Sequence, residues 1–285
     1  MTTRVAIIGQ IGAGKTELLN SAAASGIAVF REYVIGPQLA RYLKLREDVP
    51  GVAASFQESM ALGAVVRSKD MEVIRLPLVV GERLLWENVF FAQANFLAGY
   101  MSGAEIRHYK AAMRWVARDL SREAPRAVYL HASQQRAAAS IIKRDRLGEE
   151  VYDDKYLSYQ MHCYFVGLLE IELRHTRQWP RSPTAAASPW PTFSPCVIAW
   201  EKYGTWEDVA ARLEHPRRST VRLVATWADS RDHYFDLDHY LRLRPYSPEA
   251  RAFREKYFDD LAADREVIVL LRDTELGEDT LCLYE

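Results

Sequence analysis

Short runs of apolar residues alternate along the chain with longer segments in which apolar residues recur every three or four positions. The runs predict five buried strands, and the longer segments predict helices between them. The predicted strands are 5–8, 27–30, 76–80, 127–130 and 196–200. Because strands that alternate with helices are typical of a parallel sheet covered on both faces, the pattern predicts an α/β fold with a parallel five-stranded sheet.

The predicted helices follow the strands in order. They cover about 17–24, 38–73 with a break near Pro50-Gly51, 84–98, 104–120, 133–146, 154–176 and 206–213. Residues 179–195 hold five prolines and are expected to form a loop or linker. Beyond them, strands at 221–226, 267–271 and 281–284 surround a helix at 248–263. We therefore divide the chain into a main domain, 1–214, and a C-terminal extension of unassigned role, 215–285, packed on it.

Composition excludes several classes of protein. The 285 residues carry a net charge of −1, which gives no general attraction to nucleic acid or to an anionic membrane. No apolar run is long enough to span a membrane, and no signal peptide precedes the first strand. The three cysteines, Cys163, Cys196 and Cys282, show no disulfide or zinc pattern. We expect a cytoplasmic protein that acts on a small molecule.

The first predicted strand runs into the sequence GQIGAGKT at Gly9–Thr16, which fits the phosphate-binding loop (P-loop) pattern G-x-x-x-x-G-K-[ST]. Its glycines allow successive backbone N–H groups to surround a phosphate, and the helix that follows favours negative charge at its N-terminus. Lys15 would reach the β- and γ-phosphates, and the Thr16 hydroxyl would bind Mg²⁺. The residues expected to hold a nucleoside triphosphate are Gly9, Gly12, Ala13, Gly14, Lys15 and Thr16.

Charged residues follow the next two strands. Glu32 ends the second strand, and Glu82 and Arg83 end the third. The carboxyl ends of parallel strands meet at one edge of the sheet, so these residues should lie beside the P-loop. Phosphoryl transfer to a hydroxyl needs a carboxylate for the proton, a cation for the developing charge and an acid that binds the metal. The sequence therefore predicts a phosphotransferase site at this edge.

The chain resembles the deoxynucleoside kinase family, which includes deoxycytidine, deoxyguanosine and mitochondrial-type thymidine kinases. The resemblance covers about residues 4–213 and rests on Gly9–Thr16, Arg31-Glu32, Phe56-Gln57, Glu82-Arg83, Asn95, Arg144-x-Arg146, Glu149-Glu150 and His162. It implies a P-loop kinase fold, ATP or GTP with Mg²⁺, and transfer of the γ-phosphate to the 5′-hydroxyl of a (deoxy)nucleoside or modified nucleoside. It also implies a homodimer.

The resemblance assigns roles residue by residue. Glu32 is similar to the family's general base, Arg83 to the arginine that holds the reacting phosphate, and Glu82 to the acid that helps hold Mg²⁺. Gln57 is similar to the glutamine that binds the nucleobase edge. Further implied residues are Arg144 and Arg146, which resemble the arginines that close over the phosphoryl group, and Glu149 or Glu150, which resemble the acid at the sugar.

The nucleoside-binding positions depart from the family pattern. Leu84 stands where the family has serine after Glu-Arg, and Pro37 replaces an aromatic residue. Arg46 lies nearest the expected sugar-binding tyrosine, and Ser140 replaces one arginine of the lid. The base-stacking phenylalanine aligns with Ala92, with Phe91 about 100° around the helix. The phosphoryl-transfer residues are therefore largely kept, whereas the nucleoside-binding pocket is substantially rebuilt.

Two alternatives remain at this point. The segment Phe30–Ala40 also resembles thymidylate kinases, which phosphorylate nucleoside monophosphates. A kinase-like structural subunit without turnover would account for the rebuilt pocket, although Lys15, Thr16, Glu32 and Arg83 are all present. The acidic and histidine residues between Asp229 and His239 include metal-ligand types, but they have no recognised spacing, and we expect a solvated loop or a hydrogen-bonded turn.

Overall fold

The computed structural model describes most of the chain. The described residues are 2–32, 34, 36–119, 126–144, 154–175, 196–199, 205–214, 221–224 and 234–272. The proline-rich loop predicted at 179–195 and the strand predicted at 281–284 lie outside these residues.

The main sheet is parallel and has the strand order β2-β3-β1-β4-β5. Its strands are β1 (Thr3–Ile8), β2 (Ala28–Phe30), β3 (Leu78–Glu82), β4 (Arg126–His131) and β5 (Cys196–Ala199). The register places Ile7 of β1 opposite Glu82 of β3, so that the carboxyl ends of these two strands lie side by side. The P-loop, which follows β1, and Arg83, which follows β3, therefore lie at the same edge of the sheet.

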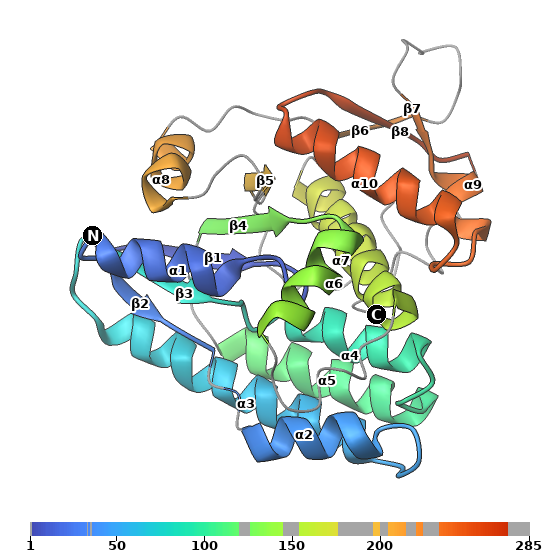
Figure 1. The fold of residues 1–285 in the computed structure, drawn as a ribbon, viewed down its shortest axis with the longest axis horizontal. Helices are drawn as coiled ribbons and strands as arrows, with labels where there is room; N and C mark the ends of the chain where they lie inside the picture. Colours follow the sequence, from blue (N-terminus) through green and yellow to red (C-terminus); the bar gives the residue numbers. More distant parts are fainter. Residues whose placement is uncertain are drawn as a thin grey trace.

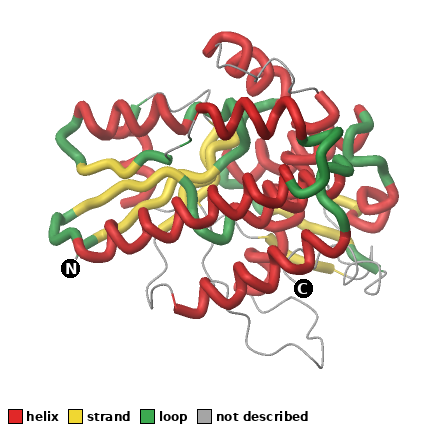
Figure 2. The backbone as a smooth tube through the Cα atoms, turned by 90° about the horizontal axis from the view of Figure 1, so that it is seen from below, coloured by secondary structure: helices red, strands yellow, loops and turns green. Residues whose placement is uncertain are grey.

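Helices cover both faces of this sheet, which confirms the predicted α/β architecture (Figures 1 and 2). On one face, α1 (Lys15–Ala24) and α8 (Trp206–Glu214) pack on the strands. The other face carries a larger apolar core that includes α2 (Gly36–Leu45), α3 (Val52–Val73), α4 (Asn88–Leu97), α5 (Gly103–Asp119) and α7 (Asp154–His175). Another helix, α6 (Gln134–Arg144), follows β4 and contacts α7. None of the helices in the described part of the chain is both long and apolar enough to cross a membrane.

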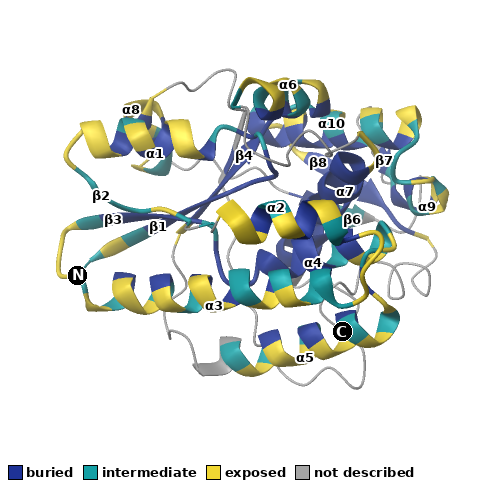
Figure 3. Cartoon of the chain, turned by 60° about the horizontal axis from the view of Figure 1, so that its bottom comes forward, coloured by how far each residue is buried: buried dark blue, intermediate teal, exposed yellow. Residues whose placement is uncertain are grey.

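Burial follows the layers (Figure 3). Most of β1, β3 and β4, together with α4 and most of α7, is buried, whereas β2 is only half-buried and α1, α3 and α5 each expose one face. Among the buried polar residues, Lys15, Gln57, Glu82 and Glu87 are each at most 7% exposed. Because buried charge is costly unless it is partnered, these residues mark the region where function is expected.

A second, three-stranded sheet follows the main sheet in sequence. Its strands are β6 (Val221–Val224), β7 (Tyr234–Asp236) and β8 (Val267–Leu270), all parallel, in the order β6-β8-β7. Two helices accompany it, α9 (Leu237–Arg242) and α10 (Pro248–Ala262). Helix α10 contacts β4, β5 and α7, and thereby joins this sheet to the main one.

Part of the segment between Asp229 and His239, predicted to lack regular structure, forms a strand and the start of a helix. Residues 234–236 form β7, and the Asp236 side chain caps α9 by accepting a hydrogen bond from the His239 N–H at 3.0 Å. Aspartate is a favoured residue at a helix N-terminus because its carboxylate satisfies a free backbone N–H. Within the described ranges, no group of histidine, cysteine, aspartate and glutamate side chains is arranged to hold a metal.

The packing of α4 against α7 depends on a glycine. Helices α4 and α7 pack together, and a Cβ placed on Gly167 would lie 2.1 Å from Cε1 of Phe90. We expect Gly167→Ala to lower the free energy of unfolding by about 1–3 kcal/mol, because overpacking outweighs the alanine helix propensity of about 1 kcal/mol. Urea unfolding followed by circular dichroism measures this change.

A matched glycine on α3 provides the control. A Cβ on Gly63 would meet no atom within 4 Å, so Gly63→Ala should be neutral or stabilise the chain by up to about 1 kcal/mol. If Gly167→Ala behaved like Gly63→Ala, the α4–α7 contact would not be as close as described.

Candidate active site

A cleft of about 440 Å³ opens at the carboxyl edge of the main sheet. The P-loop forms one end, and residues of α2, α3 and α4 form the other. The predicted site residues that line it are Gly12, Ala13, Gly14, Lys15, Thr16, Glu32, Gln57, Glu82, Arg83 and Arg144. Predicted residues from five separate segments thus meet in one cavity, and three of these segments follow strand ends as predicted.

The P-loop has the backbone geometry that its glycines allow. Gly12 and Gly14 have φ values of 80° and 90°, in the left-handed region that favours glycine. A Cβ on Gly12 would lie 2.4 Å from the Ala137 carbonyl oxygen, so a larger residue cannot fit beside α6. Gly14 also precedes the first turn of α1, which directs the free N–H groups of that helix toward the cleft.

Lys15 is buried at the base of the loop. Its Nζ donates to the Gly9 and Gln10 carbonyl oxygens at 2.7 and 2.9 Å. Burial, and after it the positive charge of Arg83, lower the pKa of Lys15 from 10.5 to about 8, although nearby carboxylates oppose the change. The ammonium is therefore held in a position where added negative charge, such as a phosphate, would stabilise it.

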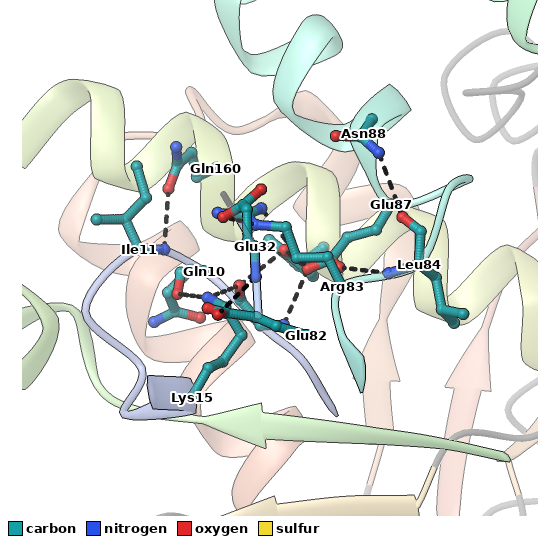
Figure 4. Close-up of polar contacts among 12 residues, drawn as sticks. Gln10, Ile11, Lys15, Glu32, Glu82, Arg83, Leu84, Glu87, Asn88 and Gln160 are labelled. Atoms are coloured by element: carbon teal, nitrogen blue, oxygen red, sulfur yellow. Dashed lines mark hydrogen bonds and ion pairs between the residues drawn. The ribbon is translucent and has the colours of Figure 1, made fainter. Parts of the chain in front are cut away.

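Glu32 and Arg83 form an ion pair in the middle of the cleft (Figure 4). Arg83 Nε donates to Glu32 Oε2 at 2.6 Å, and each side chain is 9% exposed. The Arg83 guanidinium also lies 3.9 Å from the centre of the Phe91 ring. Burial alone would lower the pKa of Arg83, but the carboxylates of Glu32 and Glu87 raise it, so the guanidinium stays charged.

Glu82 lies between the ion pair and the P-loop. Its Oε2 accepts the backbone N–H of Glu32 at 3.2 Å, which ties the end of β3 to the end of β2. Glu82 and the Thr16 hydroxyl both line the cleft. Since Mg²⁺ prefers oxygen ligands and keeps several waters, a carboxylate and a hydroxyl at an open cleft fit this ion.

A second glutamate, Glu87, is completely buried beneath these residues (Figure 4). Glu87 Oε1 accepts the Gly9 N–H at 3.0 Å, and Oε2 accepts the Leu84 N–H at 3.2 Å. The Tyr164 hydroxyl donates to Oε1 and lies 2.9 Å from the Gly9 carbonyl oxygen. Burial raises the pKa of Glu87, while Arg83, Lys15 and these hydrogen bonds oppose the rise.

The end of the cleft away from the P-loop is largely apolar and aromatic. Tyr42 and Phe56 are stacked, with ring centres 4.4 Å apart, and both line the cleft with Phe91. The amide of Asn88 donates to the Leu84 and Leu85 carbonyl oxygens at 3.3 and 3.0 Å. With Gln57 and Asn88, this end offers flat apolar surfaces and two amide groups, a combination suited to a planar heterocycle.

Some predicted residues lie elsewhere. Arg146, Glu149 and Glu150 fall outside the described residues. His162 does not line the cleft; its Nδ1 lies 2.7 Å from the Tyr240 hydroxyl and so connects α7 to α9. Burial, assisted by the charge of Arg254, lowers the pKa of His162 to about 3, so the ring is neutral at neutral pH.

The sequence did not identify Tyr42, Glu87 or Asn88 as site residues. The helix predicted at 84–98 begins only at Asn88, because Leu84 is irregular and Leu85 to Glu87 form a turn after Arg83, whose φ is 63°. The available signal for Glu87 was its place in the mostly apolar segment Leu84 to Phe91, because a glutamate is almost never fully buried unless it is paired. Tyr42 gave no signal beyond its place on the buried face of a helix.

The comparisons with known proteins decide the family. The family model for deoxynucleoside kinases matches residues 5–176, which is more than half of the chain. The chain belongs to the deoxynucleoside kinase family. It is a nucleoside kinase enzyme, and the recognition made from the P-loop and the strand-end motifs is confirmed.

Solved structures share the fold of this deoxynucleoside kinase. One is a deoxyadenosine kinase from M. mycoides with dCMP and a flexible dCDP bound, with a TM-score of 0.58 and 19% identity; the match covers 75% of this chain and all of that one. The same enzyme with dATP has a TM-score of 0.58 and 20% identity over 74% of this chain and all of that one. No curated protein matches the sequence. The family match ends before β6, β7, β8, α9 and α10.

Proposed function

We propose that this deoxynucleoside kinase transfers the γ-phosphate of ATP or GTP to the 5′-hydroxyl of a deoxynucleoside, ribonucleoside or modified nucleoside. The observation that carries the proposal is the Glu32–Arg83 pair, which lies in one cleft between the P-loop and the aromatic end. A carboxylate and a guanidinium at that junction are the groups that transfer to a hydroxyl needs. The related M. mycoides enzyme, solved with dCMP and with dATP, supports nucleosides and nucleotides as ligands.

In the proposed reaction, the acceptor oxygen forms a bond to the γ-phosphorus while the bond from that phosphorus to the β–γ bridging oxygen breaks. The electron pair of that bond stays with the diphosphate. Glu32 takes the proton of the acceptor hydroxyl; because Arg83 bonds its Oε2, Oε1 is the oxygen in position to accept it. Arg83 and Lys15 stabilise the charge that develops on the phosphoryl oxygens. Arg144, which lines the cleft, and Arg146 would close over the same group.

The remaining roles follow from position in the cleft. Gly12, Ala13 and Gly14 would hold the triphosphate through backbone N–H groups. Gly9, whose N–H donates to Glu87 and which does not line the cleft, would contribute only as the first residue of the loop. Thr16 and Glu82 would hold Mg²⁺, which neutralises phosphate charge when bound. On the acceptor side, Gln57 would bind the base edge, and Glu149 or Glu150 would bind the sugar.

The acceptor pocket differs from the family pattern in the aromatic residues that line it. Phe91, and not the residue at position 92, lines the cleft, since Ala92 is fully buried in the core. Because the Arg83 guanidinium lies over the Phe91 ring, the base would stack chiefly beside Phe56 and Tyr42. A pocket with these two stacked rings can accept a planar base without the usual phenylalanine.

We further propose that the chain forms a homodimer, works in the cytoplasm and binds no nucleic acid. We retain residues 1–214 as the kinase domain and 215–285 as an extension packed on it. The contacts of α10 with β4, β5 and α7 support the packing of the extension on the kinase domain.

Phosphate transfer from labelled ATP and GTP to a panel of deoxynucleosides, ribonucleosides and 5′-monophosphates tests the proposed function. We expect turnover of at least one nucleoside that disappears in Lys15→Ala. Turnover of a monophosphate alone would identify a thymidylate-like kinase and contradict the proposal. Triphosphate binding with no transfer would indicate a structural subunit.

Triphosphate affinity is expected to fall as the pH rises above about 8. The free chain loses the Lys15 charge above that pH because burial lowers the pKa of Lys15 to about 8. Bound phosphates favour the ammonium and raise its pKa, so binding takes up a proton there. The dissociation constant should therefore rise by up to about tenfold per pH unit. Calorimetric titration with Mg²⁺ and a non-hydrolysable ATP analogue between about pH 7.5 and 9.5 measures this dependence.

Lys15→Met supplies the control for this pH dependence. Its affinity should be weaker than that of the wild type and nearly independent of pH over the same range. A wild-type dissociation constant that stayed constant between these pH values would show that Lys15 is fully charged in the free chain.

A further inference from the structure

Glu87 is the only fully buried carboxylate, among the described residues, that contacts both the P-loop and the segment that carries Arg83. Glu87 itself does not line the cavity. Burying a charge has a high energetic cost unless the charge is paired and hydrogen-bonded. Its hydrogen bonds therefore indicate a specific task.

The first part of that task concerns Arg83. This residue has a φ of 63°, which is uncommon for a residue with a Cβ and persists only where neighbouring contacts enforce it. Two contacts do so here: Arg83 N–H donates to the Ile7 carbonyl oxygen at 2.8 Å, and the next N–H, of Leu84, donates to Glu87 Oε2 at 3.2 Å. The guanidinium NH1 also lies 3.9 Å from Glu87 Oε1. Glu87 thus fixes both the backbone and the charged end of Arg83.

The second part concerns the P-loop. Glu87 Oε1 accepts the N–H of Gly9, the first residue of the loop, and Tyr164 bonds both Glu87 and the Gly9 carbonyl oxygen. That carbonyl oxygen is also a partner of the Lys15 ammonium. One carboxylate therefore links the start of the triphosphate loop to the arginine on the acceptor side.

We propose that Glu87 is a positioning residue that couples the P-loop to Arg83, so that binding of a triphosphate fixes Arg83 in place for transfer. The proposal rests on the proposed kinase function, because it gives Arg83 and the P-loop their roles. Glu87 acts through these two elements and contacts no reacting atom. All of its hydrogen-bond partners are donors, so an amide in its place would turn an N–H group toward another donor.

Hydrogen–deuterium exchange of the whole chain tests the coupling without any acceptor. In the wild type, saturation with a non-hydrolysable ATP analogue and Mg²⁺ should slow exchange both in residues 9–16 and in residues 83–88, by about fivefold or more. In Glu87→Gln, the P-loop should still be protected at saturation, whereas residues 83–88 should gain little protection. Equal protection of both segments in Glu87→Gln would overturn the proposal.

Kinetics provide the second measurement. With a nucleoside that the wild type phosphorylates, Glu87→Gln should lower kcat by about tenfold or more, with a smaller change in KM, because the lost interaction orients Arg83 in the transition state. Asp264→Asn is the matched control, since it makes the same acid-to-amide change at the partly buried Arg212–Asp264 pair, outside the cleft. It should lower the melting temperature without changing kcat. If Glu87→Gln does the same, its role is only structural.

A third variant covers a failure of Glu87→Gln to fold. Glu87→Asp keeps the charge but is one methylene shorter, so it cannot reach the Gly9 and Leu84 N–H groups together. We expect an intermediate loss of protection in residues 83–88, and wild-type protection there would overturn the proposal. A wild type that phosphorylates no nucleoside, yet still shows protection of residues 83–88 on analogue binding, would refute the proposed function and leave the coupling intact.

Discussion

Glu32→Gln is expected to lower kcat for nucleoside phosphorylation by about 10²- to 10⁴-fold. Glutamine has nearly the same shape, but its amide cannot take the proton of the acceptor hydroxyl. The substitution also removes the 2.6 Å ion pair with Arg83. Among the carboxylates that the structure describes, only that of Glu87 then lies within 4 Å of the Arg83 guanidinium. The loss should therefore appear in kcat far more than in triphosphate affinity, because Glu32 is placed on the acceptor side of the P-loop.

Steady-state rates with the best nucleoside of the panel, together with calorimetric binding of the ATP analogue, separate these effects. Glu58→Gln is the matched control, since Glu58 is an exposed residue of α3 that does not line the cleft. It should retain wild-type kcat. If Glu32→Gln retained kcat within a few fold, Glu32 would not be the general base, and its pairing with Arg83 would be its main contribution.

The parts of the site that follow from strand order could be predicted from the sequence. The P-loop, Glu32 and Arg83 each follow a strand of one parallel sheet, and the β1–β3 register brings Ile7 and Glu82 opposite each other. Local pattern is sufficient for such residues because a parallel sheet places all its carboxyl ends at one edge. The fold class and the family were predictable for the same reason.

The parts that depend on tertiary contacts were not predicted. The segment from Leu84 to Glu87 has a helical pattern, yet Leu84 is irregular and the next three residues form a turn, because Arg83 is left-handed and Glu87 turns inward to the Gly9 N–H. The short β7 and α9 were also missed. Strand β7 is only three residues long and is defined by its pairing with β8, a partner more than thirty residues away in the chain.

The family match ends at residue 176, but the later elements take part in the same core. The Tyr240 hydroxyl of α9 forms a hydrogen bond with the His162 ring of α7. Arg254 of α10 donates a hydrogen bond to the same hydroxyl at 3.3 Å. Helix α7 also carries Tyr164, which bonds Glu87 and Gly9. The C-terminal elements therefore support the helix that braces the P-loop, although they lie outside the family pattern.

Lys15→Met is expected to reduce turnover by about 10²- to 10³-fold or more, because it removes the ammonium that we propose to bind the β- and γ-phosphates. The same substitution should leave the free chain at least as stable as the wild type at pH 7. Folding lowers the pKa of Lys15 from 10.5 to about 8, so the charged lysine destabilises the folded chain fully below about pH 8. This penalty disappears as the pH rises from about 8 to 10.5.

The shift corresponds to about 3 kcal/mol in favour of the methionine variant at neutral pH, since each pKa unit is worth about 1.4 kcal/mol. Part of this gain is offset because the Gln10 carbonyl oxygen loses its hydrogen bond from Nζ, whereas the Gly9 carbonyl oxygen keeps the Tyr164 hydroxyl. Thermal unfolding without nucleotide, at pH 7 and again near pH 10, measures the balance. The advantage of Lys15→Met should shrink at the higher pH. A variant that is clearly less stable than the wild type at both pH values would show that the hydrogen bonds of Lys15 to the Gly9 and Gln10 carbonyl oxygens stabilise the free P-loop by more than burial of the charge costs.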